Sequence, residues 1–257
     1  MKIDKIYCVN LETRKDRKDK MINLFNSLGG IFKNTEFFNA VYGKNIPKEE
    51  LNSLLSSSAW YSLNINHSDY RQIRNLGAVG CYLSHYIIWK EIVDKNYENV
   101  IIFEDDIECN KNYNYIMNII NTTPKDYDLA YLSYFTFSQL KLEDVNENWN
   151  KSTNTNIFAT NAYMISNTGA KKLLSNALPI DLQIDVYMGI QSIKIPNFKR
   201  YLCKDDLFPQ ESILQGSDIQ GICPKCIITE VSELIINQDF INFIIILVIL
   251  FLVLKYL

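Results

Sequence analysis

The sequence has few of the residues on which several common kinds of functional site depend. It contains two histidines, His67 and His85, and six cysteines that are scattered except for the Cys223-Pro-Lys-Cys226 pair. One Cys-x-x-Cys pair is weak evidence for zinc, which needs four ligands, and two histidines cannot make a dense His/Asp metal pattern. We therefore interpret the cysteines as inert thiols, with a local disulfide or metal clip at Cys223 and Cys226 left open.

Signals for phosphate loops and for nucleic acid are also missing. No Gly-x-x-x-x-Gly-Lys-Ser/Thr loop occurs in the chain. The 26 lysines and arginines are outnumbered by 29 acidic residues, and the net charge of -3 gives no electrostatic reason to expect a nucleic-acid partner. The 257 residues, 47% of them hydrophobic, are enough for one full-sized domain with a core.

The two ends of the sequence differ in hydrophobicity. The stretch MKIDKIYCVNLETRKD has an apolar run too short for a signal peptide. Residues 240–254 carry no charge, and a helix continued to Leu257 would span about 27 Å, close to the ~30 Å of a bilayer core. A buried terminal helix is the alternative, but the run has no polar face. We expect a single-pass tail anchor at 240–257, a linker at 231–239, and a globular domain at 1–230 on the cytosolic side of a membrane.

Hydrophobic patterning predicts alternating strands and helices. The expected elements, in chain order, are a strand at 6–11, an amphipathic helix at 14–29, a strand at 35–41, an irregular segment at 43–75, a buried helix at 77–96, strands at 99–103 and 129–134, a strand, turn and helix at 161–178, and a loop-rich end at 195–221. This alternation favours an α/β fold with one Rossmann-type, mostly parallel sheet flanked by helices.

Three carboxylates follow the apolar strand at 99–103. Glu104, Asp105 and Asp106 come directly after it, at the carboxyl end where ligands bind in such sheets. Adjacent carboxylates at a buried strand end repel one another, and a divalent cation with a preference for oxygen would neutralise them. It could also hold a diphosphate and take up the charge of a leaving group. The alternative is that the three residues simply begin a solvated loop.

Five segments in order resemble one known family. They are VNLETRKDR, GAVGCYLSH, IIFEDD, NAYMISNTGAKKLL with the later LPID, and FPQESILQGSDI. Together they are similar to glycosyltransferase family 25, the lipopolysaccharide and procollagen galactosyltransferase group, over residues 3–220. The resemblance implies a GT-A fold, a UDP-sugar donor, Mn²⁺ or Mg²⁺, and inversion at the anomeric carbon. It also implies that Glu104 and Asp106 straddle the metal and the donor ribose, with Asp106 the firmer metal ligand and Asp105 a supporting group.

Residues near the first strand suit the nucleotide of a donor. Asn10 and Leu11 end this strand, where a uracil would dock on backbone and amide groups. Arg14 and Arg17 are three apart on the following helix and would share a face, and arginine suits phosphate through its paired donors. A solvated basic face is the alternative for both arginines.

The start of the buried helix adds further candidates for donor binding. Gly77 and Gly80 allow a close approach of the backbone at a helix N-terminus. Ser84 and His85 lie about one turn further on. A lone histidine is usually structural, but His85 lies in the quoted motif, whereas we interpret His67 as a loop residue.

Inversion requires a base near the acceptor hydroxyl, opposite the departing UDP. Asp181 in LPID is the first candidate, and Asp185 lies four residues further on. Asp218 in GSDI is the third. Asp181 and Asp185 could instead orient the acceptor or ligate metal, and Asp218 could be structural. The segment 43–75 matches no part of the family pattern, and we expect it to shape the choice of acceptor.

The leading hypothesis is a membrane-tethered, metal-dependent enzyme that moves a galactose- or glucose-type sugar from a UDP-sugar to a hydroxyl of a glycan, lipid or protein. A second is a degenerate family member that binds sugar nucleotide or glycan without turnover. A third is a metal-dependent phosphotransferase or phosphohydrolase using the same acidic cluster; release of UDP without a phosphorylated product would separate it from the first. The chain is shorter than the two-domain collagen-modifying members, so a collagen substrate is not implied.

Overall fold

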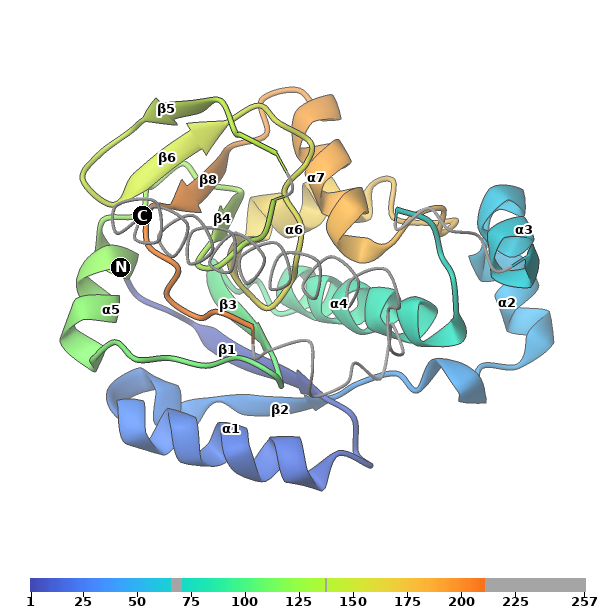
Figure 1. Cartoon of the computed structure of the whole chain (residues 1–257), viewed down its shortest axis with the longest axis horizontal. Helices are drawn as coiled ribbons and strands as arrows, with labels where there is room; N and C mark the ends of the chain where they lie inside the picture. Colours follow the sequence, from blue (N-terminus) through green and yellow to red (C-terminus); the bar gives the residue numbers. More distant parts are fainter. Residues whose placement is uncertain (66–70, 137, 211–257) are drawn as a thin grey trace, which may run out of the picture. The chain divides into compact units, whose positions relative to one another are not determined.

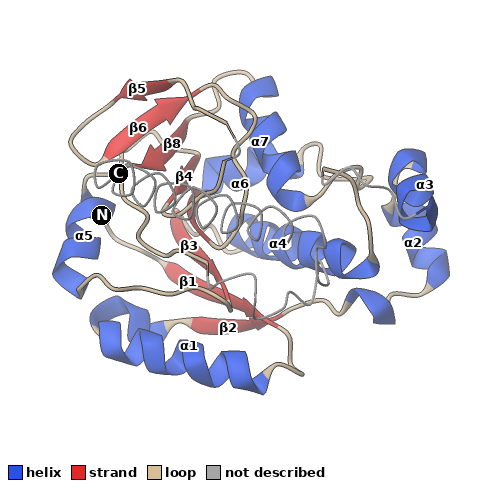
Figure 2. Ribbon diagram, in the orientation of Figure 1, coloured by secondary structure: helices blue, strands red, loops and turns tan. Residues whose placement is uncertain are grey.

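The computed structural model describes residues 1–65, 71–136 and 138–210. They form one sheet with helices on both faces (Figures 1 and 2). The strands are β1 (Lys5–Asn10), β2 (Glu36–Asn39), β3 (Asn99–Glu104), β4 (Leu129–Tyr131), β5 (Leu142–Asp144), β6 (Trp149–Ser152), β7 (Ala162–Ser166) and β8 (Arg200–Cys203). The α-helices are α1 (Lys15–Leu28), α2 (Lys48–Leu54), α3 (Ser57–Ile65), α4 (Leu76–Asp94), α5 (Tyr113–Asn121), α6 (Asn167–Leu174) and α7 (Ile184–Lys194), with 3-10 helices η1 (Gly30–Asn34) and η2 (Gly43–Asn45). The prediction of an α/β fold with a single flanked sheet is confirmed.

The sheet is mixed, and the prediction of a mostly parallel sheet is wrong. Its strand order is β2-β1-β3-β7-β4-β8-β6-β5. The pairs β1–β2, β1–β3 and β4–β8 are parallel, whereas β3–β7, β4–β7, β5–β6 and β6–β8 are antiparallel. The chain passes from β4 through β5 and β6 to β7 with no helix between them in the described residues. Without a helical crossover these strands can reverse direction, so β7 lies antiparallel between β3 and β4.

Side chains of β3 alternate between two helical layers. Ile101 and Phe103 belong to the core beneath α1 and α5, and the rings of Phe25 and Phe103 lie 5.4 Å apart. Glu104 has the opposite parity and faces α4, where His85 lies beside it. Asp105 comes one residue later and contacts Arg17 of α1. The carboxyl end of β3 therefore sends neighbouring carboxylates towards different layers.

The first predicted helix is confirmed, with a small change at its start. Met21, Phe25 and Leu28 are buried along one stripe, and the helix ends at Gly29, whose φ of +76° lies in the left-handed region that glycine favours. Arg14 is the N-cap residue and lies before the first helical residue. The prediction that Arg14 and Arg17 share a helix face therefore fails at Arg14.

The segment predicted to be irregular contains α2, α3 and η2. It connects to the main sheet domain through isolated bridges between Leu55 and Ile180 and between Gln72 and Leu182. Its helices are short, and α3 buries only Ala59 and Ser62, so the sequence has little helical periodicity. The loop-rich end similarly contains β8, all four residues of which are buried.

Several predicted features lie outside the described residues. They are the domain boundary at 230, the linker at 231–239, the tail at 240–257, and the residues His67, Asp218, Cys223 and Cys226. These stay predictions. In the part of the chain that the structure describes, no helix is both long enough and apolar enough to span a bilayer.

Candidate active site

The three predicted carboxylates lie together at the carboxyl end of β3. Glu104 is the last residue of the strand, and its backbone N–H donates to Asn161 O at 2.9 Å, where β7 begins. Asp105 and Asp106 form the turn that follows. Because β1 and β3 are parallel neighbours, Asn10 at the end of β1 reaches the same edge of the sheet.

Asp105 is compensated from the side of β1 and α1. Asn10 Nδ2 donates to Asp105 Oδ2 at 2.7 Å, and Arg17 Nη1 donates to Asp105 Oδ1 at 2.8 Å. Burial raises the pKa of Asp105 above its ordinary value, although Arg17 and Asn10 act to lower it. Asn10, which we predicted to meet a uracil, and Arg17, which we predicted to meet phosphate, therefore both hold a carboxylate of the cluster, and their roles in binding a donor stay predictions.

The two carboxylate oxygens of Asp106 have different surroundings. Gln210 Nε2 donates to Asp106 Oδ2 at 3.0 Å, and Arg17 Nη1 lies 3.4 Å from the same atom. Asp106 Oδ1 is buried and has no hydrogen-bond partner among the described residues. Burial, together with the negative charge of Glu104, raises the pKa of Asp106 to about 6. A buried acceptor without a donor suits a cation, so this oxygen fits the metal that the cluster predicts.

Glu104 is surrounded by different groups. Thr160 Oγ1 donates to Glu104 Oε1, and His85 Nε2 lies 3.4 Å from the same oxygen. Burial alone would raise the pKa of Glu104, but His85 and Thr160 lower it below its ordinary value. Cys81 Sγ lies 3.9 Å from Glu104 Oε1, and the ligand atoms of Cys81, His85 and Glu104 all lie within 4.8 Å of one another, close enough to hold a metal ion.

The structure separates the two main candidates for the base. Asp185 lies at the start of α7 and accepts from its neighbour Val186 N at 2.7 Å and from Ala159 N at 3.3 Å. Burial raises its pKa, and the charge of Glu104 raises it further, so Asp185 lies within the field of the cluster. Asp181 is exposed and accepts from Ser56 Oγ at 2.5 Å, beside the bridge to Leu55.

Protein contacts account for Gly80 and Ser84. Val41 N donates to Ser84 Oγ at 2.9 Å, and Ser84 Oγ donates to Gly80 O at 2.7 Å. A Cβ at Gly80 would lie 2.3 Å from Val41 O, so glycine lets the segment that follows β2 pack on α4. A donor role for Gly80 and Ser84 stays a prediction.

The other predicted donor residues make different local contacts. Arg14 Nη2 lies 2.8 Å from Asp16 Oδ2 in a partly exposed pair, and Leu11 O accepts from Arg14 N at 2.8 Å. Gly77 lies in the first turn of α4. A role for these residues in binding a donor stays a prediction.

Three residues of the site were missed from sequence. Cys81 and Gln210 lie inside quoted motifs, GAVGCYLSH and FPQ, and could have been found as polar residues beside predicted ones. Thr160 gave no signal, because its place beside Glu104 depends on the pairing of β7 with β3.

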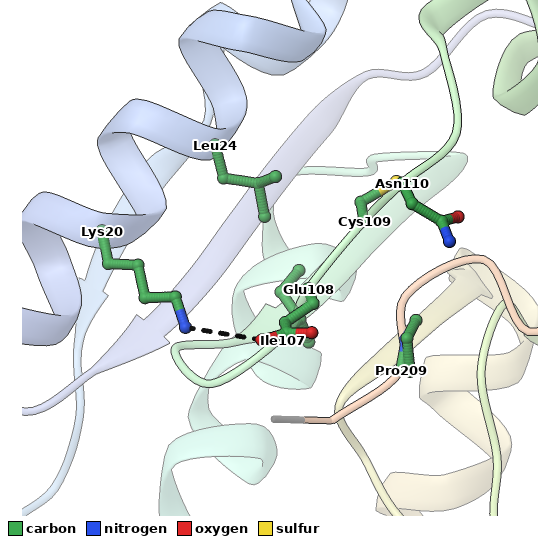
Figure 3. A pocket seen from close by; sticks show the side chains of 7 residues that line it. All are labelled: Lys20, Leu24, Ile107, Glu108, Cys109, Asn110 and Pro209. Atoms are coloured by element: carbon green, nitrogen blue, oxygen red, sulfur yellow. Dashed lines mark ion pairs between the residues drawn. The ribbon is translucent and has the colours of Figure 1, made fainter. Parts of the chain in front are cut away.

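A pocket of about 310 Å³ lies beside the cluster, between α1 and the chain that follows Asp106 (Figure 3). Lys20 and Leu24 of α1 form one wall, and Lys20 Nζ lies 4.0 Å from Glu108 Oε1. On the other side Glu108 N donates to Pro209 O at 2.8 Å, and Ile107 forms a bridge with Gln210. This pairing of 107–108 with 209–210 brings Gln210 to Asp106.

Comparisons with known proteins agree with the motifs. The family described as "Glycosyltransferase family 25 (LPS biosynthesis protein)" matches residues 3–188. A "Glycosyltransferase 25 family member" of Aedes aegypti is 30% identical over 207 residues, covering 77% of this chain and 32% of the relative. "Procollagen galactosyltransferase 2" of Homo sapiens is 30% identical over 230 residues, covering 83% of this chain and 35% of the relative. The chain thus spans about a third of the length of these relatives.

Among solved structures, a "glycosyltransferase involved in the glycosylation of the major capsid of PBCV-1" aligns with a TM-score of 0.40 at 10% identity. It covers 77% of this chain and 79% of that chain, and the likeness is too distant to carry an argument. The match of the family over most of the described sheet domain is sufficient by itself. The chain belongs to glycosyltransferase family 25, and the acidic cluster at the end of β3 lies within the matched region.

Proposed function

We propose that this glycosyltransferase moves a galactose- or glucose-type sugar from a UDP-sugar to a hydroxyl of a glycan, lipid or protein, with inversion and with Mn²⁺ or Mg²⁺. The observation that carries the proposal is the buried Oδ1 of Asp106, which has no hydrogen-bond partner among the described residues and lies in a cluster of three carboxylates. Relatives named as procollagen galactosyltransferases support the hexose. The acceptor is a separate part of the proposal, because this chain spans only about a third of those relatives.

Asp106 and Glu104 would hold the metal, which would supply positive charge to a diphosphate leaving group. Arg17 keeps Asp105 and Asp106 in place, because its guanidinium Nη1 contacts an oxygen of each. This arrangement gives Arg17 a different task from the predicted phosphate contact: it balances part of the negative charge of the cluster. The remaining charge is what a divalent cation would offset.

Asp185 is the base that the geometry favours over Asp181. Burial raises the pKa of Asp185, and a carboxylate with a raised pKa accepts a proton from a hydroxyl more readily than an ordinary one. In the proposed step Asp185 takes the proton of the acceptor hydroxyl as that oxygen bonds to the anomeric carbon. The bond from that carbon to UDP breaks, and its electron pair leaves with UDP.

The test is ligand-induced stabilisation, followed by product analysis. The melting temperature would be recorded with UDP-, GDP- and CMP-sugars, with Mn²⁺ and with a chelator. A ligand that binds only the native state raises this temperature. We expect a Mn²⁺-dependent rise with one UDP-sugar, lost in Asp106→Asn and retained in Asp144→Asn, a control at an exposed carboxylate.

Each hypothesis gives a different result. Transfer of sugar with release of UDP supports the proposal. Binding of a UDP-sugar without any glycoside product favours the degenerate reading, and a phosphorylated product favours a phosphotransferase. No stabilisation by any donor, or an unchanged response in Asp106→Asn, contradicts the metal assignment.

Membrane anchoring by residues 240–257 is a further part of the proposal, with the catalytic domain on the cytosolic side. It is supported by the uncharged run at 240–254 in the sequence. We expect the full chain to sediment with membranes and a chain truncated after Glu230 to remain in the supernatant. Equal sedimentation of the two would contradict the anchor.

A further inference from the structure

A row of buried polar groups leads from the interior of the protein to Glu104. Cys81, His85 and Trp89 follow one another at four-residue spacing on α4, so they lie on one face of the helix. Tyr163 of β7 lies against this face. Tyr163, His85 and Trp89 are all 0% exposed, so water does not reach their polar atoms.

The hydrogen bonds of this row run in one direction. Trp89 Nε1 donates to the Tyr163 hydroxyl oxygen at 3.0 Å, because an indole N–H can only donate. The same oxygen lies 2.8 Å from His85 Nδ1. The hydroxyl has one proton to donate. Of its two neighbours Trp89 Nε1 and His85 Nδ1, only His85 Nδ1 can accept it.

This direction fixes the proton on the imidazole. If Nδ1 accepts from Tyr163, the proton of a neutral His85 is on Nε2. Nε2 lies 3.4 Å from Glu104 Oε1, longer than an ordinary hydrogen bond, and it has no other partner among the described residues. A buried N–H without a partner costs free energy, and the carboxylate of Glu104 is the acceptor that lies beside Nε2.

We infer that Trp89, Tyr163 and His85 form a positioning chain that sets His85 in its Nε2–H tautomer and aims that N–H at Glu104. The inference rests on the proposed function for its effect on metal and donor, which Glu104 would bind. It also makes a separate prediction about Cys81, His85 and Glu104: in the metal-loaded enzyme His85 Nε2 keeps its proton, so it is not a metal ligand and this triad holds no metal.

The tautomer can be measured without any assay of activity. The chain has two histidines, so protein labelled with ¹⁵N-histidine gives two sets of ring signals, and His67→Gln identifies those of His85. In the full native chain we expect a protonated Nε2 and an unprotonated Nδ1 for His85. Three results would each overturn the inference. They are a proton on Nδ1 alone, protons on both nitrogens, and an Nε2 without a proton, as metal ligation would require.

Two variants test the source of the tautomer. Tyr163→Phe removes the hydroxyl that donates to Nδ1, and Trp89→Phe frees the Tyr163 oxygen to accept from Nδ1–H instead. We expect both to populate the Nδ1–H form of His85. If His85 keeps its Nε2–H tautomer in both variants, Trp89 and Tyr163 do not set it, and the inference is overturned.

Tyr82→Phe is the matched control for function. Tyr82 is also 0% exposed and lies on α4. Its hydroxyl donates to Ala177 O at 2.7 Å, and Ala177 is not a member of the positioning chain. Loss of an outer partner of a metal ligand lowers metal affinity or activity about 10- to 100-fold. We expect Tyr163→Phe to raise the Kd for Mn²⁺ and to lower kcat in that range, with the acceptor KM unchanged, and Tyr82→Phe to stay within about twofold of the native enzyme.

Equal losses of Mn²⁺ affinity and kcat in Tyr163→Phe and Tyr82→Phe, in proportion to their falls in melting temperature, would indicate a structural role for Tyr163. That result would overturn the inference. Absence of sugar transfer and of Mn²⁺ binding by the native chain would contradict the proposed function instead. In that case the ring signals of His85 in the native protein and in the two variants still show whether Trp89 and Tyr163 set its tautomer.

Discussion

Arg17 Nη1 of α1 lies 2.8 Å from Asp105 Oδ1 at the end of β3, and the side chains are only 15% and 12% exposed. Nearby Arg14 makes a contact of the same length with Asp16, but that carboxylate is 66% exposed. The two pairs have similar geometry and very different environments. This difference separates a charge that the site needs from one on the surface.

Arg17→Gln should destabilise the fold by about 2 kcal/mol, because it leaves Asp105 and Asp106 buried without their counter-charge. Arg14→Gln should cost much less than Arg17→Gln, since its ion pair with the exposed Asp16 is screened by solvent. Denaturant titration at pH 7 measures both free energies of unfolding. Equal losses of unfolding free energy in Arg17→Gln and Arg14→Gln would show that Arg17 does not offset the negative charge of the cluster.

Asp185→Asn should leave binding of the donor intact and lower the rate of transfer about 10²- to 10⁴-fold, the usual contribution of a general base. The amide oxygen can still accept from Ala159 N and Val186 N, so the local backbone should be kept. Steady-state kinetics and donor titrations separate the two effects.

Asp181→Asn is the comparison, because Asp181 is exposed and contacts Ser56. We expect less than a threefold change in the transfer rate, roughly the effect of a substitution outside the chemistry. A full loss in Asp181→Asn with normal turnover in Asp185→Asn would reverse the assignment of the base.

Gly80→Ala should destabilise the protein by about 1–3 kcal/mol, although alanine is the better helix former. The new Cβ would lie 2.3 Å from Val41 O and 2.7 Å from Gly43 N, both backbone atoms that a side-chain rotation cannot relieve. Thermal and denaturant unfolding would measure the loss. A gain in stability would contradict the close packing of α4 on the segment after β2.

Asp4→Ala should lower the free energy of unfolding by about 2 kcal/mol at pH 7, since Asp4 Oδ2 accepts from Glu98 N at 2.8 Å and from Asn99 N at 3.2 Å. Burial alone would raise the pKa of Asp4, but Lys2 and these two N–H groups lower it below its ordinary value. The native state then binds this proton less tightly than the unfolded state, in which the pKa is about 3.9. The stabilisation is therefore complete above about pH 5 and is lost as the pH falls through the lowered native pKa.

Denaturant titrations of native and Asp4→Ala protein between pH 7 and pH 3 measure this difference, with Asp144→Ala at an exposed pair as control. The two unfolding free energies of native and Asp4→Ala protein should converge towards pH 3. A difference that grows on acidification would contradict the sign.

Sequence patterns located the elements with a simple burial stripe, and they failed where tertiary contacts replace that stripe. The strands at 6–11 and 99–103 and the helices α1 and α4 were predicted. β5 was missed because Leu142–Asp144 are all exposed. β8 was missed because it starts with Arg200, whose buried guanidinium donates to Ser152 O at 2.8 Å and Ser192 Oγ at 2.8 Å. Only the folded chain supplies those acceptors.

The predicted Asn-Thr-Gly turn is in fact the first turn of α6. Ser166 is the N-cap and accepts from Gly169 N at 3.0 Å. Gly169 suggested a turn, but it is needed because a Cβ there would lie 2.0 Å from Asp128 O. A sequence does not show whether a glycine is required for close packing or for a turn, so the two cases could not be separated without the structure.

For the site, the sequence predicted the carboxylates and their neighbours Asn10, Arg17 and His85. It could not predict which neighbour contacts which carboxylate, because that depends on the parity of β3 and on the registers of β1 and β7. The choice between Asp181 and Asp185 as the base depends on the same tertiary contacts and stays a prediction. Proximity in the motif was the only criterion, and Asp185 is distinguished by its burial near Glu104.

The attachment of the segment between β2 and α4 has an evolutionary consequence. Single bridges join Leu55 to Ile180 and Gln72 to Leu182, and Val41 and Gly43 pack on Gly80 of α4. Among the described residues of the segment, none belongs to a strand of the main sheet. A segment from a relative that keeps the packing of Val41 and Gly43 on α4 could therefore replace this one while β1, β3 and the acidic cluster are retained. If this segment shapes the choice of acceptor, as we expect from the sequence, that choice would change by exchange of one segment while the acidic cluster is inherited unchanged.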